Sequence, residues 1–480
     1  MPRPLHPRWR GRHRATVLLG LLAALGGVGA RETLPPEATA ALQRARVPLD
    51  SIAVSIQEVG SGRPVLSHRA SAAVNPASLA KLMTTAAALD LLGPAWTWST
   101  PVWVQGPLRD GVLDGSVHIK GSGDPKLVVE RVWLLLRRLQ QMGVREIRGD
   151  IVLDGSAFAA AQGTPDEFDG ESNRPYNVKA EALLLNYKAV VYTFAPDPAR
   201  GVVTVAVDPP LAGLVVDRTV PLAAGPCDDW RTALKASFAE GRTRFAGSYA
   251  GSCGELSWPL ADLNPATYNA RLVEGLWREM GGRLVGSVRD GPAPTELRPS
   301  FEQRSPPLLE VVREINKFSN NVMAQQLFLT LASTRATGSP ATPAAAREVL
   351  RRWLATRLGE LPREVIIDNG SGLSREGRVS AQWLGRLLMS AYDSGWMAEL
   401  MSSLPIAGVD GTLRRSRATP GRAHLKTGSL RDVAGVAGYV LSDSGRRYVL
   451  VAIINHPQAN AARPTLDALL QWTLRDAPER

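Results

Sequence analysis

Alternating apolar and polar positions near the start of the chain predict a β-hairpin followed by a helix. After a short helical pattern over 36–46, residues 51–57 alternate, and a Gly-Ser-Gly turn leads into a second strand over 64–67. The pattern then changes to an alanine- and leucine-rich run over 75–92. Such a run has high helix propensity and predicts a largely buried helix.

The end of the chain carries a matching pattern. Residues 424–430 and 433–441 indicate two strands, and Asp443-Ser444-Gly445 indicates a tight turn into a third strand over 448–454. A closing helix is expected over 464–474, with proline in its first turn. The two chain ends can therefore build one antiparallel sheet flanked by helices. The predicted fold class is α/β (α+β), with this domain formed by residues 31–100 and 295–480.

Between these parts lies a region of short strands and turns, which we interpret as a mainly-β insertion over 101–294. It is expected to contain one or two nested subdomains. The repeated Val-Leu-Asp-Gly-Ser at 112–116 and 152–156 predicts hairpin turns. Helical spacing returns over 307–331 and is expected to continue over 341–354 and 380–401.

Residues 1–30 have the pattern of a secretory signal peptide. Five arginines precede an apolar stretch over 15–28, and Val28-Gly29-Ala30 offers small residues for cleavage. The alternative is a membrane anchor, but the apolar stretch is shorter than the roughly 20 residues that span a bilayer. We therefore expect an exported, periplasmic protein, either free or peripherally associated with the envelope.

The charge balance suggests which partners to expect. The formal net charge is +11, or +6 (11 − 5) without the five arginines of the leader. A basic surface can attract nucleic acid, but export argues against that partner. A polyanionic envelope polymer suits it better, and an ordinary solvated surface is the alternative.

Cysteine and histidine usage limits the chemistry further. Cys227 and Cys253 are expected to pair in an exported chain, with two buried free thiols as the alternative. The sequence contains no HExxH, CxxC or GxxxxGK[ST] pattern, so neither a metal nor another cofactor is expected. The glycine-rich segment 121–125 is interpreted as a turn.

The first candidate catalytic segment is Ser78-Leu79-Ala80-Lys81, at the start of the helical run over 75–92. On a helix, residues three positions apart lie side by side. A serine hydroxyl needs a neighbouring base to become a nucleophile, and Lys81 can serve if burial lowers its pKa. Taken alone, S-x-x-K is a weak signal that occurs by chance in many proteins, and a helix-terminal serine with a solvated lysine is the favoured alternative.

Two further segments carry polar groups in suitable places. Ser319-Asn320-Asn321 interrupts a helical pattern and can project into a cleft, although a plain helix cap would look similar. Lys426-Thr427-Gly428-Ser429 lies in a predicted strand. There Gly428 permits close approach to the backbone, while Lys426 and Thr427 can hold a carboxylate. An edge strand with a protective lysine is the alternative.

Together, S-x-x-K, S-x-N and K-T-G in this order are the signature of serine penicillin-interacting enzymes. The chain resembles the class C low-molecular-mass penicillin-binding proteins, the D-alanyl-D-alanine carboxypeptidase/endopeptidase family. The segments 121–125, 368–375 and 404–413 are also similar to that family, as is the long insertion between Ser78 and Ser319. Asn369 departs slightly from the expected loop.

The resemblance implies a transpeptidase-like domain with a five-stranded antiparallel sheet, and it implies roles for the motif residues. Ser78 would attack the D-Ala-D-Ala carbonyl, with Lys81 as base. Ser319 would relay a proton, and Asn321 would orient Lys81 or the substrate. Lys426 and Thr427 would hold the terminal carboxylate. The backbone N–H groups of Ser78 and Ser429 would form the oxyanion hole.

The same resemblance makes peptidoglycan stem peptides the expected substrates and β-lactams the expected covalent inhibitors. A pocket for a diamino acid side chain would need an acid, and 166–171 offers an acidic cluster, which a solvated loop would also explain. One alternative function is a β-lactamase, but the motif nearest to a deacylating glutamate, at 181–186, precedes Ser319 and has a different spacing. A non-catalytic peptidoglycan-binding scaffold is the other alternative.

Overall fold

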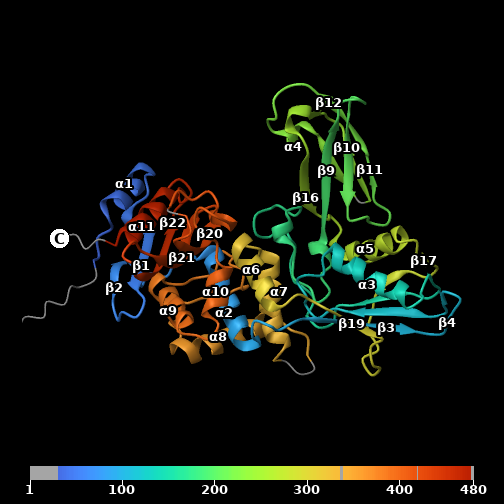
Figure 1. The fold of residues 1–480 in the computed structure, drawn as a ribbon, viewed down its shortest axis with the longest axis horizontal. Coiled ribbons are helices and arrows are strands. Elements are labelled where there is room, and N and C mark those ends of the chain that lie inside the picture. The colour runs from blue at the N-terminus through green and yellow to red at the C-terminus, as the bar shows by residue number, and fades with distance from the viewer. Residues whose placement is uncertain (1–30, 240, 336–338, 419, 477–480) are drawn as a thin grey trace, which may run out of the picture.

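The computed structural model describes residues 31–239, 241–335, 339–418 and 420–476. The expected signal peptide, 1–30, lies outside these residues. Figure 1 shows two parts side by side: a sheet-and-helix domain formed by both ends of the chain, and an inserted part that carries a tall β lobe. No helix among the described residues combines the length and the hydrophobicity that a bilayer span requires.

A five-stranded antiparallel sheet forms the centre of the first part, as expected for the fold class. Its strand order is β2-β1-β22-β21-β20. The strands come from both chain ends: β1 (Ile52–Glu58), β2 (Pro64–His68), β20 (Ala423–Leu430), β21 (Val433–Leu441) and β22 (Arg447–Asn455). The pairing of β1 with β22 joins strands from the two chain ends in one sheet.

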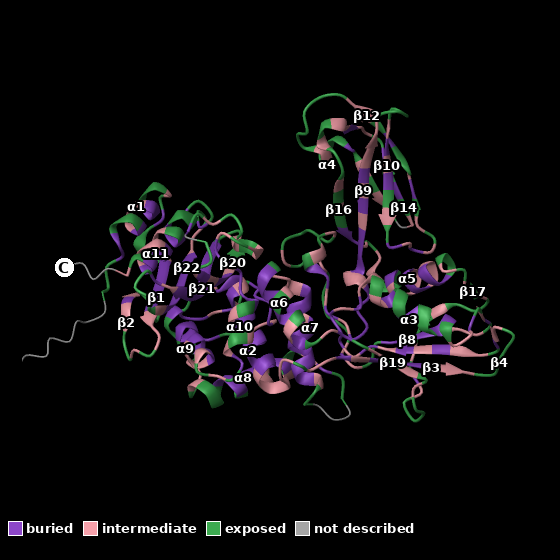
Figure 2. Ribbon diagram, viewed as in Figure 1, coloured by how far each residue is buried: buried purple, intermediate pink, exposed green. Residues whose placement is uncertain are grey.

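Helices cover both faces of this sheet, so its central strands are buried throughout (Figure 2). On one face lie α1 (Pro36–Arg44) and α11 (Arg463–Arg475), against alternate residues of β1 such as Ile52 and Val54. Ala53 between them faces the larger helical layer. This two-sided burial explains why β21 and β22 read as continuous apolar runs.

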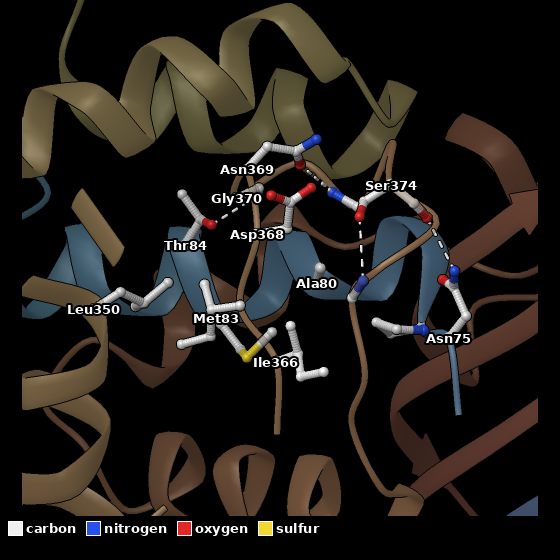
Figure 3. Close-up of a pocket in the computed structure, with 14 residues that line it drawn as sticks. Asn75, Ala80, Met83, Thr84, Leu350, Ile366, Asp368, Asn369, Gly370 and Ser374 are labelled. Atoms are coloured by element: carbon white, nitrogen blue, oxygen red, sulfur yellow. Dashed lines mark hydrogen bonds between the residues drawn. The ribbon is translucent and has the colours of Figure 1, made fainter. Parts of the chain in front are cut away.

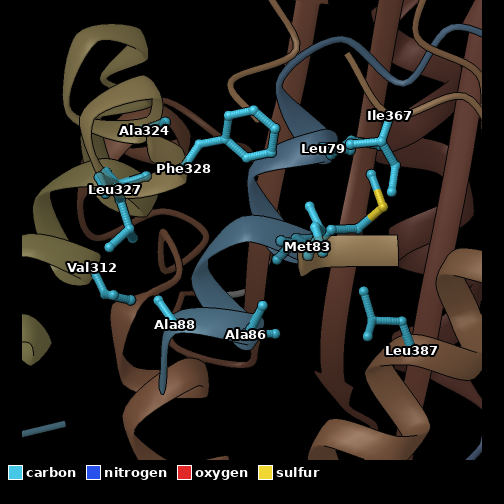
Figure 4. Packing of buried hydrophobic residues seen from close by; sticks show 14 of the residues in the cluster. Leu79, Met83, Ala86, Ala88, Val312, Ala324, Leu327, Phe328, Ile367 and Leu387 are labelled. Atoms are coloured by element: carbon cyan, nitrogen blue, oxygen red, sulfur yellow. The ribbon is translucent and has the colours of Figure 1, made fainter. Parts of the chain in front are cut away.

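The larger helical layer is built around α2 (Lys81–Leu92), which is buried on almost all sides. The 3₁₀ turn η2 (Ala77–Ala80) leads into it. Leu79 and Met83 belong to one buried cluster with Ile367, to which a neighbouring helix contributes Leu327 and Phe328 (Figure 4). The surrounding helices are α6 (Leu308–Phe318), α7 (Asn321–Ser333), α8 (Pro343–Leu358), α9 (Ala381–Tyr392) and α10 (Met397–Ser403).

The inserted part begins with two sheets and two helices. One sheet has the order β18-β8-β6-β3-β19 and the other β17-β7-β5-β4. The helices α3 (Val129–Gln141) and α5 (Pro265–Glu279) accompany them. The strands are β3 (Ser99–Gln105), β4 (Leu108–Arg109), β5 (Val112–Leu113), β6 (Ser116–Lys120), β7 (Glu146–Ile147), β8 (Ile151–Asp154), β17 (Arg283–Leu284), β18 (Val288–Asp290) and β19 (Phe301–Arg304).

The expected Asp-Gly hairpins at 112–116 and 152–156 are not formed. β5 and β6 flank the first Asp-Gly pair but lie in different sheets, and β6 and β8 run parallel with α3 between them. A Cβ on Gly115 would lie 1.8 Å from the carbonyl oxygen of Gln105. The glycine therefore permits two backbone segments to approach closely. The hairpin prediction was wrong here because an Asp-Gly pair is typical of both structures.

A smaller β lobe is nested within the insertion. Its sheets have the orders β15-β12-β10-β9-β16 and β11-β14-β13. The disulfide between Cys227 and Cys253 is present there, as expected. The elements are β9 (Ala189–Asp197), β10 (Val202–Asp208), β11 (Val215–Val216), β12 (Thr219–Ala223), α4 (Trp230–Ala233), β13 (Ala236–Ala239), β14 (Arg242–Phe245), β15 (Tyr249–Ala250) and β16 (Leu256–Ala261).

Strand pairing suggests where the inserted part begins and ends. β3 and β19 are antiparallel neighbours, with Ser99 opposite Arg304. We therefore propose that the inserted part extends over 99–304, about ten residues beyond the expected end at 294, with a nested lobe over 189–261.

The remaining helical turns are the 3₁₀ segments η1 (Leu49–Ser51), η3 (Pro175–Asn177), η4 (Asn186–Lys188), η5 (Gly251–Cys253) and η6 (Gly411–Leu413).

The turn at 121–125 contains a buried acid and provides a test of this part of the fold. The Asp124 carboxylate is fully buried, and its Oδ1 accepts from the Lys126 N–H at 2.7 Å. Its Oδ2 has no hydrogen-bond partner among the described residues. Burial raises the pKa of Asp124 from 3.8 to about 6.

Because the folded state holds this proton more tightly than the unfolded state, stability is lost as pH rises from about 4 to about 6. In Asp124→Asn, which keeps the acceptor for Lys126, that contribution is absent. The wild-type free energy of unfolding should therefore fall relative to the variant by on the order of 3 kcal/mol across this window. Urea denaturation of both proteins at pH 4, 5, 6 and 7 measures it, and parallel pH profiles would contradict it.

Candidate active site

Ser78 and Lys81 are brought together by a 3₁₀ turn. The sequence favours Ser78 in the first turn of an α-helix, but α2 begins only at Lys81 and Ser78 lies in η2. In a 3₁₀ helix the side chains at i and i+3 eclipse each other. This geometry places Lys81 Nζ 2.9 Å from Ser78 Oγ.

The 3₁₀ turn is held at its start by Asn75. Asn75 Oδ1 accepts from the N–H of Ala77, and its Nδ2 donates to the carbonyl of Ser374. The amide of Asn455 on β22 bonds both backbone groups of Asn75. Ala77 has φ of 46°, a left-handed conformation that these surrounding contacts must maintain.

Lys81 is completely buried, and its amine has three oxygen partners. Besides Ser78 Oγ, Nζ lies 2.6 Å from Asn321 Oδ1 and 2.6 Å from the carbonyl oxygen of Ser371. Burial, and secondly the charge of Lys426, hold the pKa of Lys81 well below its usual value. A neutral amine that donates to Asn321 and Ser371 directs its lone pair at the Ser78 hydroxyl.

The S-x-N segment forms the junction between α6 and α7. Ser319 ends α6 in a left-handed conformation with φ of 58°. Asn320 caps α7 through its side chain, which accepts from the N–H of Met323, and Asn321 is the first residue of that helix. The chain reversal at Ser319 turns both Ser319 and Asn321 toward the lysines.

The K-T-G segment approaches from the edge strand β20. Lys426 is completely buried, and its Nζ donates to Ser319 Oγ at 2.9 Å and to the Thr427 carbonyl at 2.8 Å. Burial lowers the pKa of Lys426 to about 7. A Cβ on Gly428 would lie 2.7 Å from the Pro76 carbonyl oxygen, so glycine lets β20 pack directly on the turn that carries Ser78.

The loop over 368–374 completes the site, and sequence reasoning assigned it no role. It supplies the Ser371 carbonyl to Lys81. Asn369, the departure from the family pattern, braces the loop: its Oδ1 accepts from the N–H groups of Ser371 and Gly372, and its Nδ2 donates to the Leu373 carbonyl. Figure 3 shows this loop against the helix of Ala80 and Thr84. The sequence feature that could have indicated this loop is Asn369-Gly370-Ser371-Gly372.

A second loop, 404–413, lies beside the C-terminal end of α6. Lys317 Nζ donates to Asp410 at 2.6 Å, and Asp410 also accepts from the N–H of Ile406. The next residues lead to Thr412, whose hydroxyl is 2.8 Å from that of Thr427. The loop therefore places a second hydroxyl beside the K-T-G strand.

A cleft of about 800 Å³ lies on the other side of the site, between the insertion and α7 and α8. Of the acidic cluster at 166–171, Glu167 lines it, while Asp169 accepts from Tyr176 and Asn177. Arg375 also lines this cleft, with its guanidinium 4.6 Å from the Phe168 ring. Among the described residues, no group of three His, Cys, Asp or Glu side chains could hold a metal ion.

The fold and this arrangement define a serine penicillin-interacting hydrolase. The chain belongs to the D-Ala-D-Ala carboxypeptidase 3 (S13) family, whose pattern it matches over residues 37–475. The resemblance inferred from the three motifs is thereby confirmed.

Individual relatives agree with this assignment. The chain is 27% identical to a D-alanyl-D-alanine carboxypeptidase of Actinomadura sp. (strain R39), over 96% of this chain and 91% of the relative. It is 24% identical to D-alanyl-D-alanine carboxypeptidase DacB of Haemophilus influenzae, over 83% and 84%. The crystal structure of penicillin binding protein 4 (dacB) from H. influenzae shares the fold, with a TM-score of 0.70 at 22% identity, covering 90% of this chain and 99% of that one.

The contact between the loop 368–374 and η2 can be tested at Gly372. This residue has φ of 77°, and a Cβ there would lie 1.8 Å from the Ala77 carbonyl oxygen. Gly372→Ala should displace the turn that carries Ser78 and slow acylation by a labelled penicillin at least about a hundredfold, since small misplacements of reacting groups cost that much. The matched control is Gly377→Ala, where the nearest atom is 3.9 Å away. Equal acylation rates in the two variants would show that the contact is unimportant.

Proposed function

We propose that this protein is a serine D-Ala-D-Ala carboxypeptidase, able also to act as an endopeptidase, that forms an acyl-enzyme at Ser78. The observation that carries the proposal is the convergence of three segments far apart in the chain. One chain of hydrogen bonds joins Ser78 Oγ, Lys81 Nζ and Asn321 Oδ1. A second hydrogen bond joins Ser319 Oγ and Lys426 Nζ. The carboxypeptidase names of the relatives support the same activity.

In the acylation step, neutral Lys81 accepts the proton of Ser78 as the hydroxyl oxygen attacks the carbonyl between the two D-alanines. The bonds from Nζ to Asn321 and Ser371 fix the amine so that its free electron pair meets the hydroxyl. Backbone N–H groups of Ser78 and Ser429 would hold the oxyanion. Each such donor is worth about a hundredfold or more in rate.

The hydrogen bond between Ser319 and Lys426 serves the leaving group. Lys426 supplies a positive charge for the terminal carboxylate, and the hydroxyls of Thr427 and Thr412 supply donors 2.8 Å apart. Ser319, bonded to Lys426, would pass its proton to the departing amine and regain one from Lys81, which took it from Ser78. Water then hydrolyses the ester. A β-lactam would form the same ester and remain bound, because its opened ring does not depart.

The cleft of about 800 Å³ would receive the donor stem peptide. Its lining carries charges of both signs, including Glu167 and Arg375, which suits a zwitterionic diamino acid side chain. Peptidoglycan stem peptides are thus the proposed substrates, and β-lactams the covalent inhibitors. Because this polymer lies outside the cytoplasm, the proposed location is the periplasm, in agreement with the expected leader peptide.

The proposed nucleophile can be tested by covalent labelling. Ser78→Ala removes the attacking oxygen and leaves the fold unchanged, so it should abolish both labelling by a fluorescent penicillin and release of D-alanine from a pentapeptide muropeptide. Gel fluorescence and chromatography measure the two outcomes, and circular dichroism verifies folding. A well-folded wild-type protein that takes no label would instead favour a non-catalytic scaffold. Rapid loss of the label from the wild-type protein would favour a β-lactamase.

The lowered pKa values of the two buried lysines lead us to expect that the rate of acylation depends on pH. Below its pKa of about 7, Lys426 is charged and can hold the carboxylate of the β-lactam; above it, that charge is lost. Lys81 must be neutral to act as base, so the rate should rise from acidic pH and fall above about pH 7. In Lys426→Arg the guanidinium stays charged, and the fall at alkaline pH should disappear. Stopped-flow acylation rates over pH 5–10 test this, and an unchanged alkaline limb in the variant would exclude Lys426 as the titrating group.

A further inference from the structure

A hollow continues the active site beyond the two threonines. It has a volume of about 570 Å³ and is lined by Gly411, Thr412, Arg414 and Arg415. Thr412 belongs both to this hollow and to the hydroxyl pair with Thr427. The hollow is therefore adjacent to the proposed position of the substrate carboxylate.

Among the described residues, the two arginines of the hollow form no ion pair. Both side chains are exposed, and within the described part of the chain neither guanidinium pairs with a carboxylate. Other arginines near the site are engaged: Arg375 pairs with Asp432 at 3.0 Å, and Arg463 bonds the Ser429 hydroxyl at 2.7 Å. Guanidinium groups without an ion pair beside the site favour an anionic ligand, because a carboxylate can form bidentate hydrogen bonds with arginine.

The loop that carries these arginines is held in place. Its anchor is the ion pair of the buried Lys317 ammonium with Asp410 at 2.6 Å. Gly411 packs on the Lys317 carbonyl, where a Cβ would lie 2.6 Å from the oxygen. The backbone that leads into the hollow is therefore fixed before a ligand binds, which lowers the entropic cost of binding.

A free terminal D-alanine needs none of this hollow, since its carboxylate ends at the threonines. In a cross-linked peptide, however, the leaving amine belongs to a second stem peptide, which continues past that point and bears further carboxylates. We propose that Arg414 and Arg415 bind these carboxylates and so select cross-linked peptidoglycan. This inference rests on the proposed carboxypeptidase function and names the acceptor stem peptide as the group that the hollow receives.

The test compares two substrates: a monomeric pentapeptide muropeptide and a dimer cross-linked through D-alanine. The variant Arg414→Ala/Arg415→Ala should lower kcat/KM for the dimer about tenfold more than kcat/KM for the monomer, the range expected for charge-assisted contacts that are partly exposed to solvent. The matched control is Arg417→Ala, which removes an exposed arginine of the same loop that does not line the hollow. It should leave the ratio of the two values unchanged.

Two further measurements separate charge recognition from a general disturbance. A dimer whose acceptor-stem carboxylates are amidated should be cleaved at similar rates by wild type and variant. Raising the salt concentration should slow wild-type cleavage of the unmodified dimer more than cleavage by the variant.

The outcomes distinguish this inference from the proposed function. If wild type releases D-alanine and takes penicillin label, but the double variant loses activity on both substrates equally or on neither, the arginines do not select the cross-link. A wild-type enzyme that acts on the monomer and leaves the dimer intact also overturns the inference. If wild type neither takes label nor acts on either substrate, the proposed function itself fails, and the inference with it.

Discussion

The buried amine of Lys81 is the interaction on which the rest of the site depends. A fully buried ammonium is costly unless its hydrogens are bonded, and the three oxygens around Nζ come from η2, α7 and the loop 368–374. These segments are far apart in the chain, so the amine is satisfied only when the fold closes around it. The same closure buries the amine and lowers the pKa of Lys81, so that a side chain that is ordinarily protonated can lose its proton more easily.

A second buried lysine, Lys426, lies beside the first in the site. Lys426 adds to the depression of the Lys81 pKa, because two like charges in one dry site oppose each other. The pair therefore favours one charged and one neutral amine. Ser319 bonds Lys426 while Ser78 bonds Lys81, so each lysine serves a different hydroxyl. Environments that separate the protonation states of two neighbouring groups are the usual basis for assigning acid and base roles.

The sequence specified the parts of this protein that depend on local pattern. The hydrophobic alternation of β1, the continuous apolar runs of β21 and β22, and the proximity of Ser78 and Lys81 follow from spacing alone. Three features could not be found in this way. Every residue has a backbone carbonyl, so only the tertiary structure shows that the carbonyl of Ser371 contacts Lys81. The Asp-Gly pair at 114–115 marks the place where the chain passes close to the end of β3, and it has the same composition as a hairpin turn. The 3₁₀ form of η2 depends on the bonds of Asn75 to Asn455 and Ser374, which lie hundreds of residues away.

The position of the insertion explains how a large region can be accommodated without disturbing this chemistry. The chain leaves the first part at Trp98 and returns at Ser305, and the two residues exchange hydrogen bonds between the Ser305 N–H and the Trp98 carbonyl and between the Trp98 N–H and the Ser305 hydroxyl. Because the two ends of the insertion are adjacent, its length adds little to the entropic cost of closing the loop. The inserted part nevertheless returns to the site through residues 159–180, which line the large cleft opposite α7. The two buried lysines are thus held by the first part of the fold, while residues of the inserted part form the opposite wall of the cleft.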